Sequence, residues 1–217
     1  MISVFDVIGP NMIGPSSSHT AGALRIALMA KNLVSVPIEE VEFILYGSFA
    51  KTYKGHGTDK ALLAGILRMN TEDEHIKDAL EIAKSKGLKY KFTIDESPIN
   101  SHPNTVKIII NKNVSVVGES IGGGNIKIIE INNIKVEFTG EYSTLIVKQY
   151  DKKGVLAHIT HCLSEYEINI AFLKLYREEK GQKAYTVIEA DQKINSDVID
   201  EIKQNQFIID VNLIEVK

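Results

Sequence analysis

The sequence has little of several features that would define its class. Its only cysteine is Cys162, so the chain forms no internal disulfide, as is usual in a reducing compartment. Lys and Arg number 25 against 28 Asp and Glu, and the net charge of −3 lacks the basic excess that favours nucleic acid. No apolar run approaches the roughly 20 residues that span a bilayer. We therefore expect no nucleic-acid or membrane partner.

The N-terminal stretch also lacks the positive start and long apolar core of a signal peptide, so a cytoplasmic location is expected. What the chain does have is ordinary globular composition, with 44% hydrophobic and 24% charged residues. Its 217 residues suffice for two modest domains, since single domains commonly run to about 100–200 residues.

The N-terminal part of the chain predicts helices and strands in alternation. The predicted elements are a helix from about 20 to 34, a strand over 41–49, a helix that Thr58 or Asp59 caps, a helix that Thr71 and Glu74 begin as a capping box and Gly87 ends, and a strand over 88–95. From 105 to 138 the chain reads as short Ile- and Val-rich strands broken by turns. This part is predicted to be a sheet-rich α+β domain.

Near 139–143 the pattern restarts. The elements that follow are predicted in the order β-α-β-β-α-β, with Val155, Ile159 and Leu163 on the buried face of the first helix. This order is typical of the ferredoxin-like unit. We therefore predict an α+β protein with one domain over 1–140 and a second over 141–217.

The most distinctive stretch is "GPSSSHT", Gly14–Thr20, at the start of the first predicted helix. A helix N-terminus presents unpaired N–H groups and a partial positive charge, and short hydroxyls extend this donor set. The stretch therefore suits a small anion such as an amino-acid carboxylate, with His19 as donor, base or orienting group. It equally fits a helix capped by one serine, with the other serines in a solvated turn.

Three further stretches share this chemistry in weaker form. "YKGHGTD" places His56 between two glycines, "INSHPNT" carries His102 before a proline, and the glycines of "SIGGGN" either cradle an anion or form a turn. The remaining histidines, His75, His158 and His161, are expected at the surface. No Asp, Glu or Cys pattern completes a metal site with them, and Cys162 is expected to be a small buried hydrophobe.

Taken together, the motifs resemble the beta subunits of bacterial iron–sulfur-dependent L-serine dehydratases (L-serine ammonia-lyases). The resemblance covers essentially the whole chain and is carried by "FDVIGPNMIGPSSSHTAGALR", "GSFAKTYKGHGTDKALLAG", "HPNT" and "SIGGG", in this order and before a βαββαβ module. It implies an N-terminal domain of the allosteric substrate-binding type, which also occurs in some D-3-phosphoglycerate dehydrogenases. It also implies a C-terminal ACT domain.

The reaction implied by the resemblance is the deamination of L-serine to pyruvate and ammonia, with a [4Fe–4S] cluster as Lewis acid on the serine hydroxyl. Such a cluster needs at least three thiolates, and this chain has one cysteine. The resemblance therefore implies that a separate alpha subunit holds the cluster, that no metal ligand lies in this chain, and that the chain is inactive alone.

The resemblance also implies site residues. One of His19, His56 and His102 is the base that removes the α-proton, and the flanking glycines favour His56. The implied substrate-binding residues are Ser16, Ser17, Ser18, Thr20, Gly57, Thr58, Asn104 and Thr105.

In the C-terminal half, "DKKGVLAHI" resembles the loop where ACT domains bind amino acids at a dimer interface. The implied ligand residues are Asp151, Gly154, Val155 and Leu156, although many such domains only dimerise. Two other functions fit the sequence. One is a stand-alone amino-acid sensor without catalytic activity, and the other is a pure assembly subunit.

Overall fold

The protein is described here by a computed structural model, which covers residues 11–97, 102–177 and 179–214. The chain divides into two compact units, Met1–Thr139 and Gly140–Lys217. Three parts of the motifs discussed above lie outside the described residues. These are residues 5–10 of "FDVIGPNMIGPSSSHTAGALR", residues 99–101 of "INSHPNT", and Glu178, which lies in the sequence between the second and third predicted strands of the C-terminal half.

Unit 1 is a six-stranded sheet in the order β2-β1-β3-β4-β5-β6, in which β1 pairs parallel with β2 and antiparallel with β3. The strands are β1 (Glu40–Tyr46), β2 (Lys89–Asp95), β3 (Thr105–Ile110), β4 (Val114–Gly122), β5 (Asn125–Ile131) and β6 (Ile134–Phe138). The helices are η2 (Ser17–Gly22), α1 (Ala23–Asn32), α2 (Gly47–Thr52), α3 (Thr58–Ile66), η3 (Glu74–Asp78) and α4 (Ala79–Ser85).

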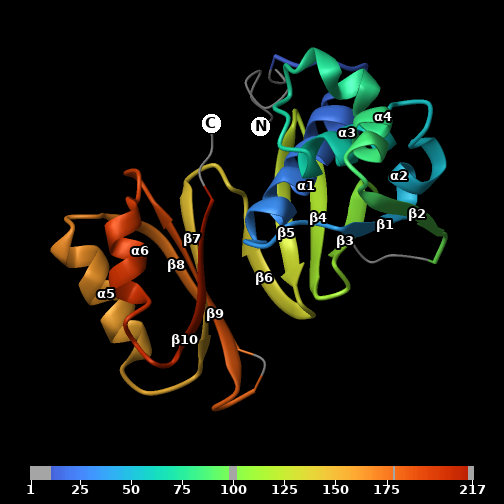
Figure 1. The fold of residues 1–217 in the computed structure, drawn as a ribbon. Helices are drawn as coiled ribbons and strands as arrows, with labels where there is room; N and C mark the ends of the chain where they lie inside the picture. The colour runs from blue at the N-terminus through green and yellow to red at the C-terminus, as the bar shows by residue number, and fades with distance from the viewer. Residues whose placement is uncertain (1–10, 98–101, 178, 215–217) are drawn as a thin grey trace, which may run out of the picture. The chain divides into compact units, whose positions relative to one another are not determined.

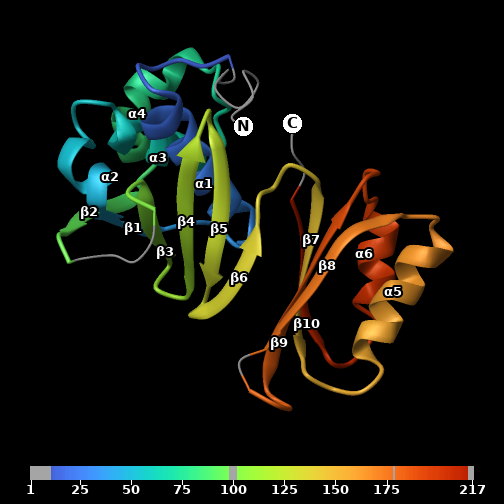
Figure 2. The same ribbon diagram turned by 180° about the vertical axis from the view of Figure 1, so that it is seen from behind.

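Helices cover one face of this sheet. Figure 1 shows α1 and α3 in front of the strands, and Figure 2 shows the same strands from the other side. The pattern of β1 explains this layering, because Val41, Phe43 and Leu45 alternate with half-buried residues and are themselves at most 3% exposed. The core of unit 1 therefore lies between this face and the apolar sides of α1 and α3.

Two predicted elements of unit 1 differ at their ends. The strand predicted over 41–49 ends at Tyr46, because Gly47 adopts a φ of +52° and the chain turns into α2. The helix predicted from about residue 20 is preceded by the π-helical turn η2, for which Ser16 is the N-cap. Ser17 and Ser18 therefore lie inside a helical turn, and Ser16 caps that turn.

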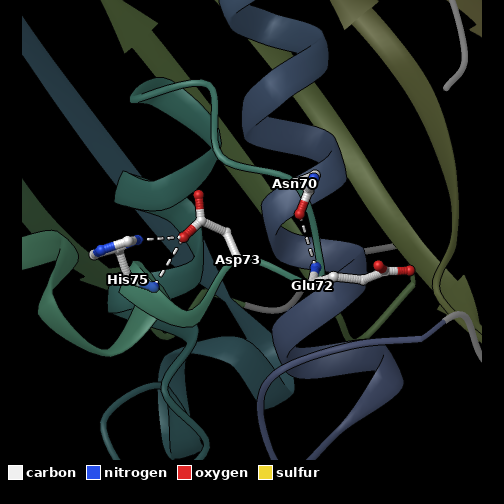
Figure 3. Close-up of polar contacts among 4 residues, drawn as sticks. All are labelled: Asn70, Glu72, Asp73 and His75. Atoms are coloured by element: carbon white, nitrogen blue, oxygen red, sulfur yellow. Dashed lines mark hydrogen bonds and ion pairs between the residues drawn. The ribbon is translucent and has the colours of Figure 1, made fainter.

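The predicted helix caps further along the chain were wrong. Thr71 and Glu74 form no capping box. Asp73 is the N-cap of η3 and accepts hydrogen bonds from the backbone N–H of His75 at 2.9 Å and from its Nδ1 at 2.8 Å, as Figure 3 shows. Asn70 accepts from the N–H of Glu72 in the same turn. Asp73 takes the capping position because its carboxylate lies two residues before His75 and can accept the backbone N–H of that residue.

The start of α3 also differs from the prediction. Neither Thr58 nor Asp59 caps this helix. Gly57 occupies the N-cap position with a φ of +68°, and no side chain within the described residues caps α3. The N–H groups at this N-terminus are nevertheless used within the chain, since that of Thr58 donates to the carbonyl of Tyr53 at 2.8 Å and that of Lys60 donates to Asp59 Oδ1 at 2.8 Å.

Unit 2 has the predicted β-α-β-β-α-β order. Its elements are β7 (Ser143–Tyr150), α5 (Val155–Glu165), β8 (Ile170–Arg177), β9 (Lys183–Ala190), α6 (Ser196–Ile202) and β10 (Ile208–Ile214). The sheet order is β10-β7-β9-β8, and both helices cover the same face of it (Figure 1). As predicted, Val155, Ile159 and Leu163 are buried against this sheet, which confirms the α+β class and the ferredoxin-like topology.

Within the part of the chain that the structure describes, every helix is too short or too polar to cross a membrane.

Candidate functional site

The first component of the site is the segment Ser16–Thr20, which we call the serine loop. The Ser16 hydroxyl accepts a hydrogen bond from the backbone N–H of His19 at 3.1 Å and lies 3.4 Å from His19 Nδ1. The carbonyl of Ser16 accepts from the N–H of Thr20 at 2.8 Å. Ser16 therefore fixes both the backbone and the ring of His19.

The His19 ring lies between side chains of α2 and the segment that follows it. Its Nε2 is 3.0 Å from the hydroxyl of Ser48, and its ring contacts Phe49 edge to face at a centroid distance of 5.3 Å. Both ring nitrogens of His19 thus have a serine partner. Burial, and then the charge of His56, lower the pKa of His19 from its usual value of 6.5, so His19 is neutral at neutral pH.

His56 lies directly against His19. The two rings meet at a centroid distance of 4.7 Å and an interplanar angle of 68°. His56 Nδ1 is buried and has no hydrogen-bond partner within the described residues, although the side chain is only half-buried. No hydrogen bond of His56 Nε2 is found within the described residues either, so both ring nitrogens are without a polar partner there.

The backbone around His56 is held from two sides. The Thr20 hydroxyl donates to the carbonyl of His56 at 3.1 Å, which ties the serine loop to the His56 segment. The N–H of His56 donates to the carbonyl of Thr52 at the end of α2. Thr58, two residues on, is fully buried, and its hydroxyl has no partner within the described residues.

His102 belongs to a loop that contacts the same region. The carbonyl of Pro103 accepts a hydrogen bond from the N–H of Ser48 at 2.7 Å. The N–H of Asn104 donates to His102 Nδ1 at 3.2 Å, and the buried carboxylate of Glu119 accepts from the N–H of His102 at 3.1 Å. A neutral His102 therefore carries its proton on Nε2 and presents a donor there.

A series of hydrogen bonds joins these segments into a closed ring. Ser120 on β4 donates its hydroxyl to the carbonyl of Ser18 at 2.9 Å, and its N–H donates to the carbonyl of Asn104 at 2.9 Å. We call this the hydrogen-bond ring; its members in order are Ser18, His19, Ser48, Pro103, Asn104 and Ser120. Gly22 makes it possible, because a Cβ there would lie 2.0 Å from the Ser120 hydroxyl.

The structure thus gathers the serine loop, His56 and the His102 loop, which the sequence predicted as separate motifs. The sequence analysis did not single out Ser48, Glu119 or Ser120 as site residues. Ser48 and Ser120 lie in the quoted motifs "GSFAKTYKGHGTDKALLAG" and "SIGGG", so their place beside His19 and Ser18 had a signal in the sequence. Glu119 had none, because a single Glu in a strand is ordinarily a solvated residue.

Comparison with known families identifies the family to which this chain belongs. The family model described as "Serine dehydratase beta chain" matches residues 3–130, which include every residue of the hydrogen-bond ring. The chain belongs to the serine dehydratase beta chain family. This confirms the resemblance inferred from the motifs. A second family model, "ACT domain", matches residues 143–206 in unit 2.

Relatives of this family are similar over nearly the full chain. A "Probable L-serine dehydratase, beta chain" of Bacillus subtilis is 43% identical, with 98% of this chain and 97% of the relative covered. An "L-serine dehydratase, beta chain" of Peptoniphilus asaccharolyticus is 44% identical, with 88% of each covered. A "D-3-phosphoglycerate dehydrogenase" of Bacillus subtilis is 24% identical over 88% of this chain, but only 37% of that longer relative is covered.

The ACT-domain residues predicted to hold a ligand lie at the start of α5. Asp151 accepts a hydrogen bond from the N–H of Gly181 at 3.0 Å and lies 3.4 Å from Arg177. The bond from Gly181, and then the charge of Arg177, lower the pKa of Asp151. Gly154 is exposed with a φ of +85°, and Val155 is buried in the core while Leu156 is half-buried. Asp151 therefore anchors the β8–β9 hairpin.

The donor set of this chain does not fit an iron–sulfur cluster. Its single cysteine, Cys162, is 2% exposed and packs in the core of unit 2, and burial raises the pKa of its thiol. No group of three or more His, Cys, Asp or Glu side chains within the described residues is arranged to hold a metal. Thiolate ligands for such a cluster would have to come from elsewhere.

Proposed function

We propose that this chain is the beta subunit of an L-serine dehydratase, a lyase that converts L-serine to pyruvate and ammonia together with an alpha subunit. The observation that carries the proposal is the contact between the His19 and His56 rings beside the serine loop, in a chain of this family. We assign residues 1–140 to the substrate-binding domain and 141–217 to the ACT domain. Family membership favours this function over a stand-alone sensor.

His56 is the proposed base for the α-proton of serine. Nε2 of His56 has no hydrogen-bond partner within the described residues and can accept a proton, whereas both nitrogens of His19 already lie beside serine hydroxyls. Two rings at 4.7 Å do not both become cationic readily, so His19 stays neutral when His56 accepts the proton. His19 is therefore assigned to orientation of its neighbours and His56 to proton transfer.

His102 is assigned a different task. Its Nδ1 accepts from the N–H of Asn104, so its Nε2–H serves as a hydrogen-bond donor to an anionic group. A donor of this kind suits the substrate carboxylate or the enolate-like charge that develops when the α-proton leaves.

The remaining predicted substrate contacts separate into two groups. The hydroxyls of Ser17 and Ser18 make no hydrogen bond within the described residues, so we assign them to the substrate carboxylate. The N–H groups of Gly57 and Thr58 already donate to the carbonyls of Lys54 and Tyr53, so we assign these two residues to holding the His56 segment. Thr20 and Thr105 donate their hydroxyls to the carbonyls of His56 and His102, and Ser16 holds His19. These three, with Asn104, therefore support the site by holding the histidines.

The hydroxyl group of serine leaves poorly without a cation on its oxygen. Since this chain lacks the thiolates for a [4Fe–4S] cluster, we assign the cluster, and with it the activation of the leaving group, to the alpha subunit. The dehydrogenase relative supports this division, because it is similar over 88% of this chain but carries the name of a different enzyme. We also propose a cytoplasmic location and dimerisation through the ACT domain.

The experiment that tests the proposal is an anaerobic assay of pyruvate release from L-serine, with this chain alone and with a reconstituted cluster-bearing alpha subunit. We expect activity only in the mixture. His56→Ala is expected to lower kcat by about 10²–10⁴-fold. His102→Gln, which keeps a donor near the Nε2 position, is expected to lose far less.

Two results would count against the assignment. Equal losses for His56→Ala and His102→Gln would remove the case for His56 as base. A mixture that stays inactive with an intact cluster, while the chain alone binds L-serine in a calorimeter, would favour the sensor. Full activity after alanine replaces all three histidines would favour an assembly subunit.

A further inference from the structure

Ser48 is linked to all three histidine segments through three different polar groups. Two of these links are direct hydrogen-bond contacts, and the third reaches His56 through Thr52. Its hydroxyl lies 3.0 Å from His19 Nε2, and its N–H donates to the carbonyl of Pro103, next to His102. Its carbonyl accepts the hydroxyl of Thr52 at 2.8 Å, and the carbonyl of Thr52 in turn accepts the N–H of His56. No other residue of the hydrogen-bond ring connects all three segments within the described residues.

The backbone before Ser48 is shaped for this role. A Cβ on Gly47 would lie 2.5 Å from the carbonyl oxygen of Pro103, and Gly47 has a φ of +52° that side-chain-bearing residues rarely adopt. The His102 loop therefore approaches α2 closely at this point. The backbone of Ser48, from which its hydroxyl projects, is therefore held in place by the His102 loop.

The Ser48 hydroxyl is the closer of the two polar partners that orient the His19 ring toward His56. The contact of Ser48 with Nε2 is 3.0 Å, shorter than the 3.4 Å contact of Ser16 with Nδ1. The ring has an aromatic contact on each of two sides, Phe49 and His56, and neither contact fixes rotation about the ring axis through a hydrogen bond. Without Ser48, the ring keeps its contacts but loses its closer polar partner.

We propose that Ser48 is a positioning residue of the dehydratase site, which sets the orientation of the His19 ring beside His56. This inference rests on the proposed function for its effect on catalysis, but its effect on His19 is independent of it. Ser48 acts through His19 and is assigned no contact with the substrate.

The test compares Ser48→Ala, Ser48→Thr and Ser85→Ala in the full chain. Threonine keeps the hydroxyl, and Ser85 is an exposed serine on α4 whose hydroxyl donates to the carbonyl of Ile82, so Ser85→Ala is the matched control. The first readout is the ¹⁵N NMR spectrum of the labelled His19 ring in the chain alone. The second is kcat and KM for L-serine in the complex with the alpha subunit.

We expect Ser48→Ala to shift the His19 ring nitrogens and to lower kcat by about tenfold to 100-fold with KM little changed. Ser48→Thr restores both, and Ser85→Ala leaves both as in the wild type. Unchanged His19 signals in a folded Ser48→Ala chain overturn the proposal, and so does an unchanged kcat. If the wild-type complex is inactive, the proposed function fails, while the NMR comparison still decides whether Ser48 sets His19.

Discussion

Each of the three site histidines has a different set of partners, and these partners separate their chemistry. His19 has a serine at each nitrogen, His56 has a buried nitrogen without a partner within the described residues, and His102 accepts a backbone N–H. These partners support the proposal that the same residue type serves as an oriented neutral ring, as a proton acceptor and as a donor. The distinction comes from hydrogen bonds rather than from residue type.

The lowered pKa of His19 predicts how stability depends on pH. The folded chain binds a proton at His19 less readily than the unfolded chain, so its contribution is present at neutral pH and is lost as the pH falls through about 6.5 toward the lowered folded value. We expect His19→Gln to lose less free energy of unfolding than the wild type between about pH 7.5 and about pH 5.5. Urea denaturation at the two pH values measures this.

His161→Gln is the control for this comparison, because His161 is exposed on α5 in the other unit. Its pH dependence should match that of the wild type. Parallel profiles for the wild type and His19→Gln would show that His19 has no such effect.

At this scale the sequence predicted the motif residues but not their partners. His19, His56 and His102 stand out because a histidine among glycines, serines or prolines has no role in an apolar core. Ser48 and Ser120 do not stand out in this way, since serines after a strand or within one are common. Their meaning depends on contacts with residues 29 and 102 positions away, which no local pattern contains.

At the scale of elements, the site depends on close approach between η2 and β4. A Cβ on Gly22 would lie 2.0 Å from the hydroxyl and 2.7 Å from the Cβ of Ser120. Because Ser120 also holds Ser18 and Asn104, any displacement of β4 from η2 opens the hydrogen-bond ring. Packing and site geometry are thus coupled at one glycine.

Gly22→Ala is therefore expected to lower the free energy of unfolding by about 1–3 kcal/mol, as overpacking does in a tight core. Adding Ser120→Gly should restore part of this loss, because it removes the clashing atoms. Gly55→Ala is the matched control, since a Cβ there would lie 3.8 Å from its nearest neighbour. Urea unfolding of the four chains measures these differences, and equal stability of Gly22→Ala and Gly55→Ala would contradict the packing argument.

The elements themselves were largely predictable, with errors at their ends. The βαββαβ order of unit 2 follows from clear changes of hydrophobic period. The helix α2 was missed because "GSFAKT" continues the apolar run of β1, and only the positive φ of Gly47 separates the two. The capping box at Thr71 failed because the helix begins later, with Asp73 as its N-cap, and the Thr71 hydroxyl instead donates to the carbonyl of Asn11.

At the scale of the whole molecule, the single cysteine separates the two kinds of chemistry proposed for the enzyme. Cys162 is buried among apolar residues of unit 2, whereas His19, His56 and His102 lie in unit 1. A cluster ligand must reach its iron, and a thiol in this core does not. On the proposed function, this chain would supply binding and proton transfer, and its partner would supply the metal.

Cys162→Ala is expected to leave the iron and sulfide content of the complex unchanged and kcat close to that of the wild type. A loss of about 1 kcal/mol in stability is expected from the buried site. Iron and acid-labile sulfide analysis of the purified complex, next to the pyruvate assay, measures both. Loss of iron from a folded Cys162→Ala complex would place the cysteine among the cluster ligands.

The hydrogen-bond ring also has a consequence for how the protein is made. Two of its serines, Ser18 and Ser120, are 102 residues apart, and β4 must be complete before they meet. At about 5–20 residues per second, a ribosome needs about 5–20 s to go from one to the other. For those seconds the growing chain presents the serine loop with no partner on β4, and the histidines come together only after most of unit 1 has been synthesised.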